Sequence, residues 1–412
     1  MEKFINEPGI LSKSDKMFSD RITDVPRSFI REILKVAISP DVISFAGGLP
    51  NRELFPVENL KQSAIKVFDN MGRDALQYSN SEGFMPLREY ISHYYQSKHS
   101  IQVHPDNILI TSGSQQGLDL LGKVLLNQND EVIIEEPGYL GAIQAFSLYR
   151  PKFRPVPLQN VGIDTDVLKK VLSTANPKLM YVVPEFQNPS GISYTLETRL
   201  KIVDIIKSRR CYIVEDNPYI DLRFEGTGSG SFYSFLPERT VLLGTFSKTA
   251  VPGLRLGWII APDELMDKLI IAKQASDLHT NIFTQMLLFR YLSDNDINSH
   301  ISKIITVYGR QRNAMINAIE KHFPPDIRFT RPQGGMFLWV TLPDFLSSMD
   351  LFNMAIEKKV AFVPGNPFYT DRKETYSTLR LNFSCSDENT ILIGIKRMSE
   401  AIHQLLKKPI DS

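Results

Sequence analysis

A lysine and an arginine stand close together in the stretch GTFSKTAVPGLRLGW, residues 244–258. Lys248 follows the apolar run TVLLGTF, which is typical of a buried strand, and Arg255 lies within the same stretch. Neither charged side chain is stable in an apolar interior without a partner. A lysine at the end of a strand can form a Schiff base with a carbonyl compound, and such a compound would provide that partner.

Pyridoxal 5′-phosphate (PLP) is a carbonyl cofactor with four separate requirements for binding. An amine must hold its aldehyde, and a carboxylate must keep its ring nitrogen protonated so that the ring can accept electrons. A hydrogen-bond donor must hold its phenolate oxygen, and hydroxyl and cationic groups must hold its phosphate. The sequence contains a candidate for each of these requirements.

The candidates for the ring of PLP follow short apolar runs. Asp216 ends the run CYIVED, where a carboxylate is costly unless it pairs with a cation such as a pyridinium. Asn188, in PEFQNPSG, presents an amide, and Tyr219 lies three residues beyond Asp216. Tyr139, in EEPGY, could stack on the ring.

The candidates for the phosphate lie at a predicted helix and beside the lysine. Ser114 and Gln115 begin the stretch SQQGLDLLGKVLL, which predicts a helix that Ser114 caps. Backbone N–H groups and the helix dipole favour a phosphate at such an end. Ser247 and Arg255 flank Lys248 and could add a hydroxyl and a guanidinium group.

Each candidate taken alone has a simpler structural explanation. An Asn-Pro-x-Gly sequence is typical of a turn, and aspartate and serine residues often cap helices. The arginine could form a surface salt bridge, and the two tyrosines fit equally well in the core or at its rim. Their combination and order are what favour a PLP site.

Other catalytic and binding motifs are missing from the sequence. The stretch around Lys248 lacks the glycines of a P-loop, and EGTGSGSF, residues 225–232, has Ser231 where a dinucleotide-binding motif needs its third glycine. The seven histidines show no metal-ligand spacing, and no H-E-x-x-H, C-x-x-C or G-x-S-x-G motif occurs. A net charge of +1 gives no general attraction for nucleic acid or anionic membranes.

The composition also indicates a cellular compartment. Cys211 and Cys385 are too few for a disulfide framework and fit a reducing environment. The first residues lack the apolar core of a signal peptide, and no stretch approaches the ~18 apolar residues of a transmembrane helix. We therefore expect a cytoplasmic protein that binds neither membranes nor nucleic acid.

The elements that must position these residues alternate along the chain. Helical patterns separate several short apolar runs, which predict strands at residues 107–111, 131–137, 178–184, 211–216, 240–246 and 256–262. Such alternation is typical of an α/β domain with a mostly parallel sheet flanked by helices. Because ligands bind at the carboxyl ends of the strands in such sheets, the polar candidates should meet at one edge.

A chain of 412 residues is too long for one ordinary core. After about residue 300 the pattern predicts a smaller α+β domain. We expect an N-terminal segment (1–45) that packs with the small domain and the active site, a large PLP-binding domain (46–300) and a small C-terminal domain (301–412). Arg380 interrupts the strand-like TLRLNF, which fits either a buried salt bridge or a bidentate carboxylate site.

These motifs together make the chain resemble the fold-type I PLP-dependent aminotransferases of class I/II, over about residues 15–408. The subgroup of α-aminoadipate and kynurenine aminotransferases is the most similar. The resemblance is carried by ISFAGGLPNRELFP, ALQYSNSEGFMPLR, ILITSGSQQGLDL, EEPGYLGAIQAF, PEFQNPSG, EDNPY, GTFSKTAVPGLRLGW, RPQGGMFLWV, VAFVPGNPF and LRLNFS. It implies the fold of that family, with a mostly parallel seven-stranded sheet in the large domain and a smaller α+β domain.

The resemblance also implies roles for the residues that touch the cofactor ring. Lys248 would hold the aldehyde and then move a proton between the α-carbon of the substrate and the cofactor. Asp216 would pair with the ring nitrogen, and Tyr219 and Asn188 would bind the phenolate oxygen, with Asn188 also near the substrate. Tyr139 would stack on the ring.

The remaining implied roles concern the phosphate, the substrate and a second subunit. The phosphate would be held by Ser114, Gln115, Ser247 and Arg255. Arg380 would bind the α-carboxylate of the substrate, and the loop with Gly48 would cover it. Tyr78 would reach the phosphate of a neighbouring subunit, so a homodimer with shared active sites is expected.

The implied reaction is a ping-pong transamination. An L-amino acid, either α-aminoadipate or glutamate and also an aromatic or branched-chain one, would give its amino group to 2-oxoglutarate. Two alternatives stay open: another fold-type I PLP enzyme such as a β-lyase, and the effector-binding domain of a transcription regulator. Release of ammonia and pyruvate from a cysteine conjugate would indicate the lyase. Binding in a nucleic-acid mobility-shift assay would indicate the regulator.

One pocket must accept both a distal carboxylate and an apolar side chain, and a mobile arginine could meet both demands. Arg31, in the helix predicted from SFIREILK, is the candidate, since the α-aminoadipate branch has a Ser-x-x-Arg similar to Ser28 and Arg31. A solvated helix arginine is the alternative. Arg31→Ala should lower kcat/KM for α-aminoadipate roughly tenfold more than for leucine, because only the former loses an ion pair. Equal losses in steady-state kinetics would contradict this role.

Overall fold

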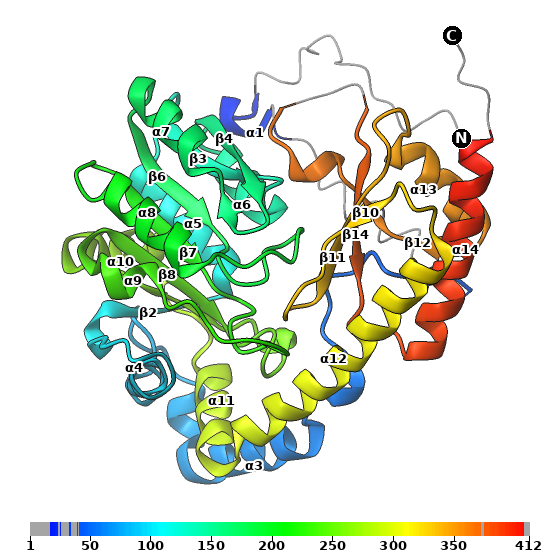
Figure 1. Ribbon diagram of the computed structural model, residues 1–412. Helices are drawn as coiled ribbons and strands as arrows, with labels where there is room; N and C mark the ends of the chain where they lie inside the picture. The colour runs from blue at the N-terminus through cyan, green and yellow to red at the C-terminus, as the bar shows by residue number, and fades with distance from the viewer. Residues whose placement is uncertain are drawn as a thin grey trace.

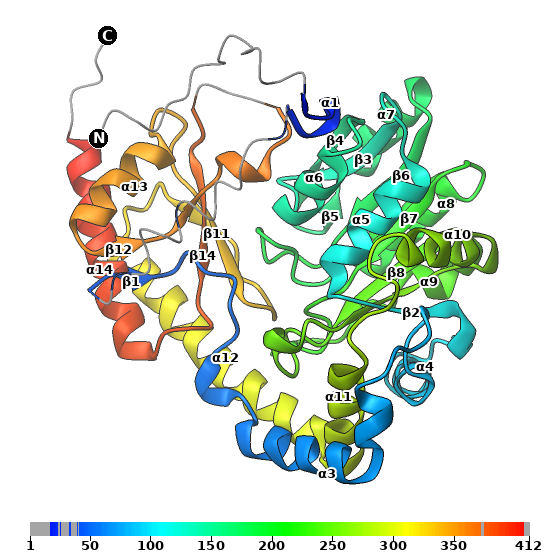
Figure 2. The same cartoon turned by 180° about the vertical axis from the view of Figure 1, so that it is seen from behind.

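The computed structural model describes residues 17–23, 25, 33, 39, 41–371 and 375–407. A large sheet and a small sheet, each with its own helices, lie side by side (Figure 1). The long helix α12 (Ile297–His322) runs from the large sheet's side of the molecule toward the small sheet (Figure 2). The fold is therefore of the α/β type that the alternating pattern predicts.

The large sheet contains the predicted strands. In spatial order its strands are β2 (Ile108–Thr111), β9 (Gly257–Ile260), β8 (Thr240–Thr245), β7 (Tyr212–Asp216), β6 (Pro177–Val182), β3 (Glu131–Glu136), β4 (Lys152–Gln159) and β5 (Gly162–Ile163). Strands β8, β7, β6, β3 and β4 are parallel, whereas β9 runs antiparallel to both β2 and β8. The two-residue β5 extends the expected seven strands at the edge.

The pattern of short apolar runs does not pick out β4. Its sequence, KFRPVPLQ, contains two prolines, and proline cannot donate a hydrogen bond to a neighbouring strand. The strand is next to the edge of the sheet, where it pairs with β3 along its length and with β5 only at its end. Its position explains why prolines are tolerated there.

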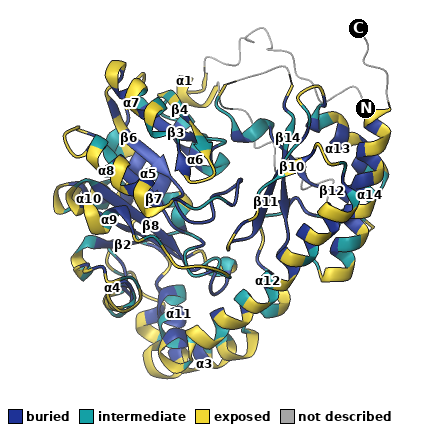
Figure 3. Ribbon diagram, viewed as in Figure 1, coloured by how far each residue is buried: buried dark blue, intermediate teal, exposed yellow. Residues whose placement is uncertain are grey.

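Helices cover both faces of the large sheet. One face packs against α5 (Ser114–Leu125), α6 (Leu140–Ser147) and α10 (Asp263–Gln274). The other packs against α7 (Thr165–Thr174), α8 (Leu196–Ile206) and α9 (Phe232–Phe235). Helices α4 (Met85–His99) and α11 (Ile282–Asp294) pack near β2 and β9, and α3 (Val57–Ala75) lies against α11. The central strands are buried and the outer helix faces are exposed (Figure 3).

The small sheet has the order β10 (Arg328–Phe329), β11 (Phe337–Thr341), β14 (Thr378–Asn382) and β13 (Val363–Pro364). It packs with α12, α13 (Ser348–Glu357) and α14 (Glu388–Leu406) around one apolar core. From the N-terminal part of the chain, β1 (Ile43–Ser44) pairs with β12 (Val360–Ala361). These two strands form a separate sheet, and the backbone N–H of Asn382 in β14 donates to the carbonyl oxygen of Phe45 at 2.8 Å, which joins this segment to the small sheet.

The remaining elements are short. They are α1 (Asp20–Thr23) and the 3-10 helices η2 (Arg52–Leu54), η3 (Pro105–Asn107), η4 (Pro237–Arg239), η5 (Pro252–Leu254) and η6 (Asn366–Phe368). Among the described residues, no helix is both long and apolar enough to cross a membrane.

The start of α5 differs from the sequence expectation. Gly113, not Ser114, is the residue that caps this helix, and within the described residues no capping side chain accepts a hydrogen bond from its first N–H groups. Gly113 has a positive φ of 75°, which glycine adopts without strain. The expectation of a serine cap was wrong, and the consequence is a helix start whose N–H groups are free of a capping side chain.

Candidate active site

A cavity of about 420 Å³ lies at the carboxyl ends of the parallel strands and reaches the small sheet. It brings together most of the residues that the sequence singles out. These are Gly48, Ser114, Gln115, Tyr139, Asn188, Asp216, Tyr219, Ser247, Lys248, Arg255 and Arg380. They come from strand β14, the end of β7, the start of α5 and the loops that follow β1, β3, β6, β7 and β8.

Among the predicted residues that the structure describes, Tyr78 does not line this cavity. Tyr78 is 79% exposed, and the ring of His279 lies edge-on to its ring, with the ring centres 6.0 Å apart. Its predicted contact with a neighbouring subunit stays a prediction. Ser28 and Arg31 lie outside the described residues.

Lys248 has no carboxylate partner within the part of the chain that the structure describes. Its Nζ donates a hydrogen bond of 2.8 Å to the carbonyl oxygen of Gly48 and lies 6.0 Å from the centre of the Tyr219 ring. Burial, and next the charge of Arg380, lower the pKa of Lys248 to about 8. At pH 8 the amine is therefore about half neutral, which is the form that acts as a nucleophile or base.

Asp216 is a buried carboxylate with one hydrogen bond. The hydroxyl of Tyr181 donates to its Oδ2 at 2.7 Å, and its Oδ1 has no partner among the described residues. Burial raises the pKa of Asp216 to about 7, and the Tyr181 hydrogen bond opposes that rise. A carboxylate in this state gains most from a cationic N–H donor, which the ring nitrogen of PLP would be.

Arg380 and Asn188 form the side of the cavity nearest the small sheet. Arg380 donates from Nη1 to Oδ1 of Asn188 at 2.9 Å and from Nη2 to the carbonyl oxygen of Ala46 at 2.7 Å. Its guanidinium carbon lies 4.3 Å from the ring centre of Phe337 and 5.3 Å from that of Phe368. These contacts fix the plane of the guanidinium group.

The charge of Arg380 is not neutralised by any carboxylate of the described chain. Its Nε has no hydrogen-bond partner there, although the residue is only 3% exposed. Burial lowers the pKa of Arg380 to about 10, so the side chain stays protonated at neutral pH. The salt-bridge alternative for this arginine is therefore not met, and a carboxylate ligand would supply the missing charge.

The other end of the cavity suits an anion. A Cβ on Gly113 would lie 2.5 Å from Nη2 of Arg255, so only glycine lets the guanidinium approach the start of α5. Arg255 donates to the carbonyl oxygens of Ser112 and Pro252 at 3.4 Å and pairs with no carboxylate in the described chain. The Ser247 hydroxyl receives a hydrogen bond of 2.9 Å from Thr245. Free helix N–H groups, a guanidinium and a hydroxyl together fit a phosphate.

Tyr181 and Thr245 line the cavity but are not among the sequence candidates. Tyr181 lies in the middle of the apolar run KLMYVV, where an aromatic residue is typical of a core strand. One feature of the sequence could have pointed to Tyr181: it is the only residue of that run with a side-chain hydroxyl. The sequence does not show, however, that this hydroxyl reaches Asp216, because that contact depends on the order of the strands in the sheet.

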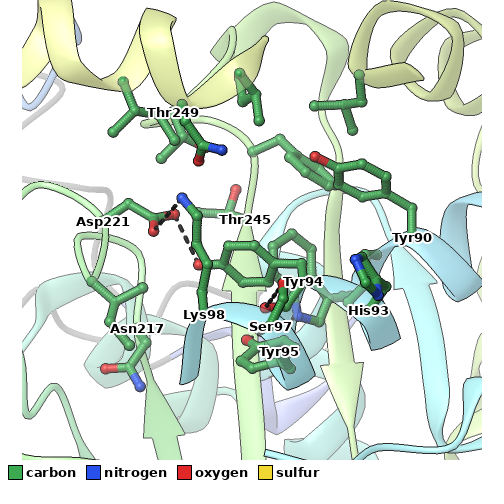
Figure 4. A pocket seen from close by; sticks show the side chains of 18 of the residues that line it. Tyr90, His93, Tyr94, Tyr95, Ser97, Lys98, Asn217, Asp221, Thr245 and Thr249 are labelled. Carbon is green, nitrogen blue, oxygen red and sulfur yellow. Dashed lines mark hydrogen bonds and ion pairs between the residues drawn. The ribbon is translucent and has the colours of Figure 1, made fainter. Parts of the chain in front are cut away.

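A second cavity of about 190 Å³ lies behind the first, between α4, the start of α12 and the loop after β7. Thr245 and Pro218 line both cavities. Its charged groups pair with each other: Asp221 accepts from the Tyr94 hydroxyl at 2.8 Å and lies 3.6 Å from Nζ of Lys98 (Figure 4). This internal pairing distinguishes it from the first cavity, where Lys248, Asp216 and Arg380 form no ion pair with one another.

Burial of Asp216 predicts a pH-dependent effect on stability. Because its folded pKa of about 7 exceeds the reference value of 3.8, stability is lost as pH rises from about 4 to 7 and stays lost above that. In PLP-free protein at pH 8, Asp216→Asn should raise the free energy of unfolding by roughly 2–4 kcal/mol, and the gain should shrink toward pH 4. Denaturant unfolding measures it.

The exposed Asp204, which pairs with Lys207 at 2.6 Å, provides the control. Asp204→Asn should change the free energy of unfolding by less than about 1 kcal/mol. A pH-independent effect of Asp216→Asn would contradict the burial argument.

Comparisons with known proteins agree with this geometry. The chain is 40% identical to an aromatic-amino-acid aminotransferase of Thermococcus litoralis over 96% of each chain, and 40% identical to a 2-aminoadipate transaminase of Thermus thermophilus over 93% and 95%. The solved α-aminoadipate aminotransferase of Thermus thermophilus, complexed with N-(5′-phosphopyridoxyl)-L-leucine, is 39% identical with a TM-score of 0.89, covering 96% of this chain and 99% of that one. The sequence profile "Aminotransferase class I and II" matches residues 40–397. The chain belongs to the aminotransferase class I and II family.

Proposed function

We propose that the cavity binds PLP at Lys248 and transfers the amino group of an L-amino acid to a 2-oxo acid. One observation carries this proposal: a lysine, an arginine and an aspartate line one cavity, and none of them pairs with another. Such an arrangement is costly for the protein alone. It suits a ligand that brings an aldehyde, a ring cation and carboxylate or phosphate groups.

The residues present fit PLP at each of its functional groups. Oδ1 of Asp216 is free to accept from a ring N–H, and Tyr139 lies beside the site with its ring stacked on Tyr181 at a 25° interplanar angle. Asn188 and Tyr219 would hold the phenolate oxygen. The start of α5, with Ser114, Gln115, Ser247 and Arg255, would hold the phosphate.

The bound cofactor supplies an aldehyde for amines and a protonated ring that accepts electrons. The residues of the chain do the rest. The neutral amine of Lys248, favoured by its lowered pKa, would act at Nζ as the base that removes and carries the α-proton of the substrate. Asp216 would accept from the ring nitrogen at Oδ1 and so keep that nitrogen protonated. Arg380 fixes the α-carboxylate and so orients the α-proton toward the lysine.

The substrate class follows from the same site and from the relatives. The relatives are named for aromatic amino acids and for 2-aminoadipate, so we place the substrates of this chain among α-aminoadipate, glutamate, and aromatic or branched-chain amino acids. The acceptor in the proposal is 2-oxoglutarate, whose α-carboxylate Arg380 would bind in the same way.

A homodimer belongs to the same proposal. Tyr78 and its neighbour Leu76 are 79% and 76% exposed, and the apolar residues Phe68 and Leu278 are also exposed nearby in the α3 and α11 region. Exposed apolar side chains that gather in one region mark interaction surfaces. The surface would bring Tyr78 of one subunit to the phosphate of the other.

The first prediction concerns the cofactor and Lys248. The protein mixed with PLP should develop visible absorption that bleaches with α-aminoadipate and returns with 2-oxoglutarate. Lys248→Ala should lower the transamination rate by at least about 100-fold, because the base is lost. Lys98→Ala, which removes a lysine outside the active-site cavity, should keep both the absorption and the rate. A wild-type protein that takes up no PLP would contradict the proposal.

The second prediction concerns Arg380. Arg380→Lys keeps a positive charge but loses the planar group that holds a carboxylate with two hydrogen bonds. The value of kcat/KM for amino acids should fall about 10- to 100-fold, while the visible absorption of bound PLP persists. Arg88→Lys is the matched control, since Arg88 is also buried but pairs with Asp106 away from the cavity. Similar losses of kcat/KM in both variants would contradict a role in carboxylate binding.

A further inference from the structure

Asp216 is held by a tyrosine on the neighbouring strand. Strands β6 and β7 are parallel, with Tyr181 opposite Val214 and Val182 opposite Glu215. Side chains alternate along a strand, so Tyr181 and Asp216 lie on the same face, one step apart diagonally. The Tyr181 hydroxyl thereby reaches Oδ2 of Asp216 at 2.7 Å.

The position of Tyr181 is itself fixed by packing. Its ring stacks on Tyr139 with ring centres 6.4 Å apart, and meets Phe146 edge-on at 6.0 Å. The residue is fully buried in the core between the large sheet and helices α5 and α6. A side chain held in this way places its hydroxyl with little freedom.

The adjacent acid, Glu215, provides an internal comparison. It points to the opposite face, where it accepts from the Ser231 hydroxyl at 2.6 Å and from the Asn217 amide at 2.9 Å, with Arg199 at 3.6 Å. Both oxygens of Glu215 therefore have partners. Asp216, equally buried, has a partner on one oxygen only.

We propose that Tyr181 is a positioning residue for the carboxylate that holds the cofactor's ring nitrogen. Its hydroxyl occupies Oδ2 of Asp216 and so leaves Oδ1 as the single acceptor for a ring N–H. Without the hydroxyl the two oxygens are equivalent, and the carboxylate is free to rotate about its last bond. The hydrogen bond also favours the ionised carboxylate, which is the form that pairs with a protonated ring. This inference rests on the proposed function.

Tyr181→Phe tests the inference because it removes the hydroxyl and keeps the ring packing. The dissociation constant for PLP, measured by titrating cofactor-free protein, should rise roughly tenfold. The pH midpoint of the visible absorption of bound PLP should also shift upward. A proton held on the ring nitrogen disfavours a second protonation of the same cofactor. Because the variant holds the ring proton less firmly, the second protonation should occur at a higher pH.

Tyr194→Phe is the matched control. Tyr194 is also fully buried and donates to a buried carboxylate, with 2.8 Å between its hydroxyl and Oε1 of Glu135, but it does not line the cavity. Glu135 keeps its hydrogen bonds from Gln187 and the Val183 N–H after the change. Both variants should lose stability, and only Tyr181→Phe should change PLP affinity and the pH midpoint.

A double-variant measurement separates positioning from structural damage. In the Asp216→Asn background, Tyr181→Phe should leave the PLP affinity unchanged, since the group through which the hydroxyl acts is absent. The Asp216→Asn substitution also removes a buried charge and should stabilise the fold. The double variant can therefore be measured even if Tyr181→Phe alone folds poorly.

The outcomes are distinguishable. If wild type and Tyr181→Phe take up PLP with equal affinity and equal pH midpoints, the inference about Tyr181 is wrong and the proposed function stands. The inference is also wrong if Tyr194→Phe gives the same shifts, or if the effect of Tyr181→Phe persists in the Asp216→Asn background. If the wild-type protein takes up no PLP, both the proposed function and this inference are wrong.

Discussion

A carboxylate buried without a cation of its own is the constraint from which the rest of the site follows. Asp216 ends a strand whose other side chains are apolar or fully paired, and burial raises its pKa to about 7. The chain could have neutralised it with an arginine, as it does for Glu215 on the other face of the same strand. The cations that line the cavity instead point elsewhere: Lys248 to Gly48, and Arg380 to Ala46 and Asn188. The ionisable side chains of the site thus stay unpaired with one another before any ligand arrives, which is how a preorganised catalytic site differs from an ordinary core.

The two sheets position different ionisable side chains of the cavity. Lys248 and Asp216 follow or end strands of the large sheet, and the start of α5, where we propose that the phosphate binds, packs against the same sheet. Close backbone approach at that end depends on glycines, since a Cβ on Gly257 would lie 2.6 Å from the backbone nitrogen of Ser114. The small sheet carries Arg380, and the hydrogen bond from Arg380 to Asn188 joins it to the loop after β6. A carboxylate bound at Arg380 and a phosphate bound at α5 would therefore have their relative positions set by contacts between the sheets.

Sequence reasoning located residues of the cavity where polar side chains break an apolar pattern. Asp216, Lys248 and Arg380 each stand out because a charged side chain at the end or middle of a strand needs a reason, and the family match places them in an aminotransferase. The same reasoning passed over Tyr181, because an aromatic residue within a strand is what a core requires. It passed over β4 because two prolines interrupt the strand pattern of this segment, and it assigned to Ser114 a cap that Gly113 provides. Distances across the sheet, such as that from Tyr181 to Asp216, depend on strand order, which local patterns do not encode.

The directions of the pKa shifts point to one kind of ligand. Burial lowers the pKa of Lys248 and of Arg380 and raises that of Asp216, so each group's charge is disfavoured in the cavity as it stands. Burial of each of these three charged forms costs free energy. In a site with a purely structural role we would expect such groups to pair with one another or to be replaced by apolar residues. Their separation is stable only because the surrounding core and the Tyr181, Asn188 and Gly48 contacts hold them there. A ligand that pairs with Lys248, Arg380 and Asp216 at once gains binding free energy from each of them. Part of this binding free energy can stabilise the transition state rather than the ground state.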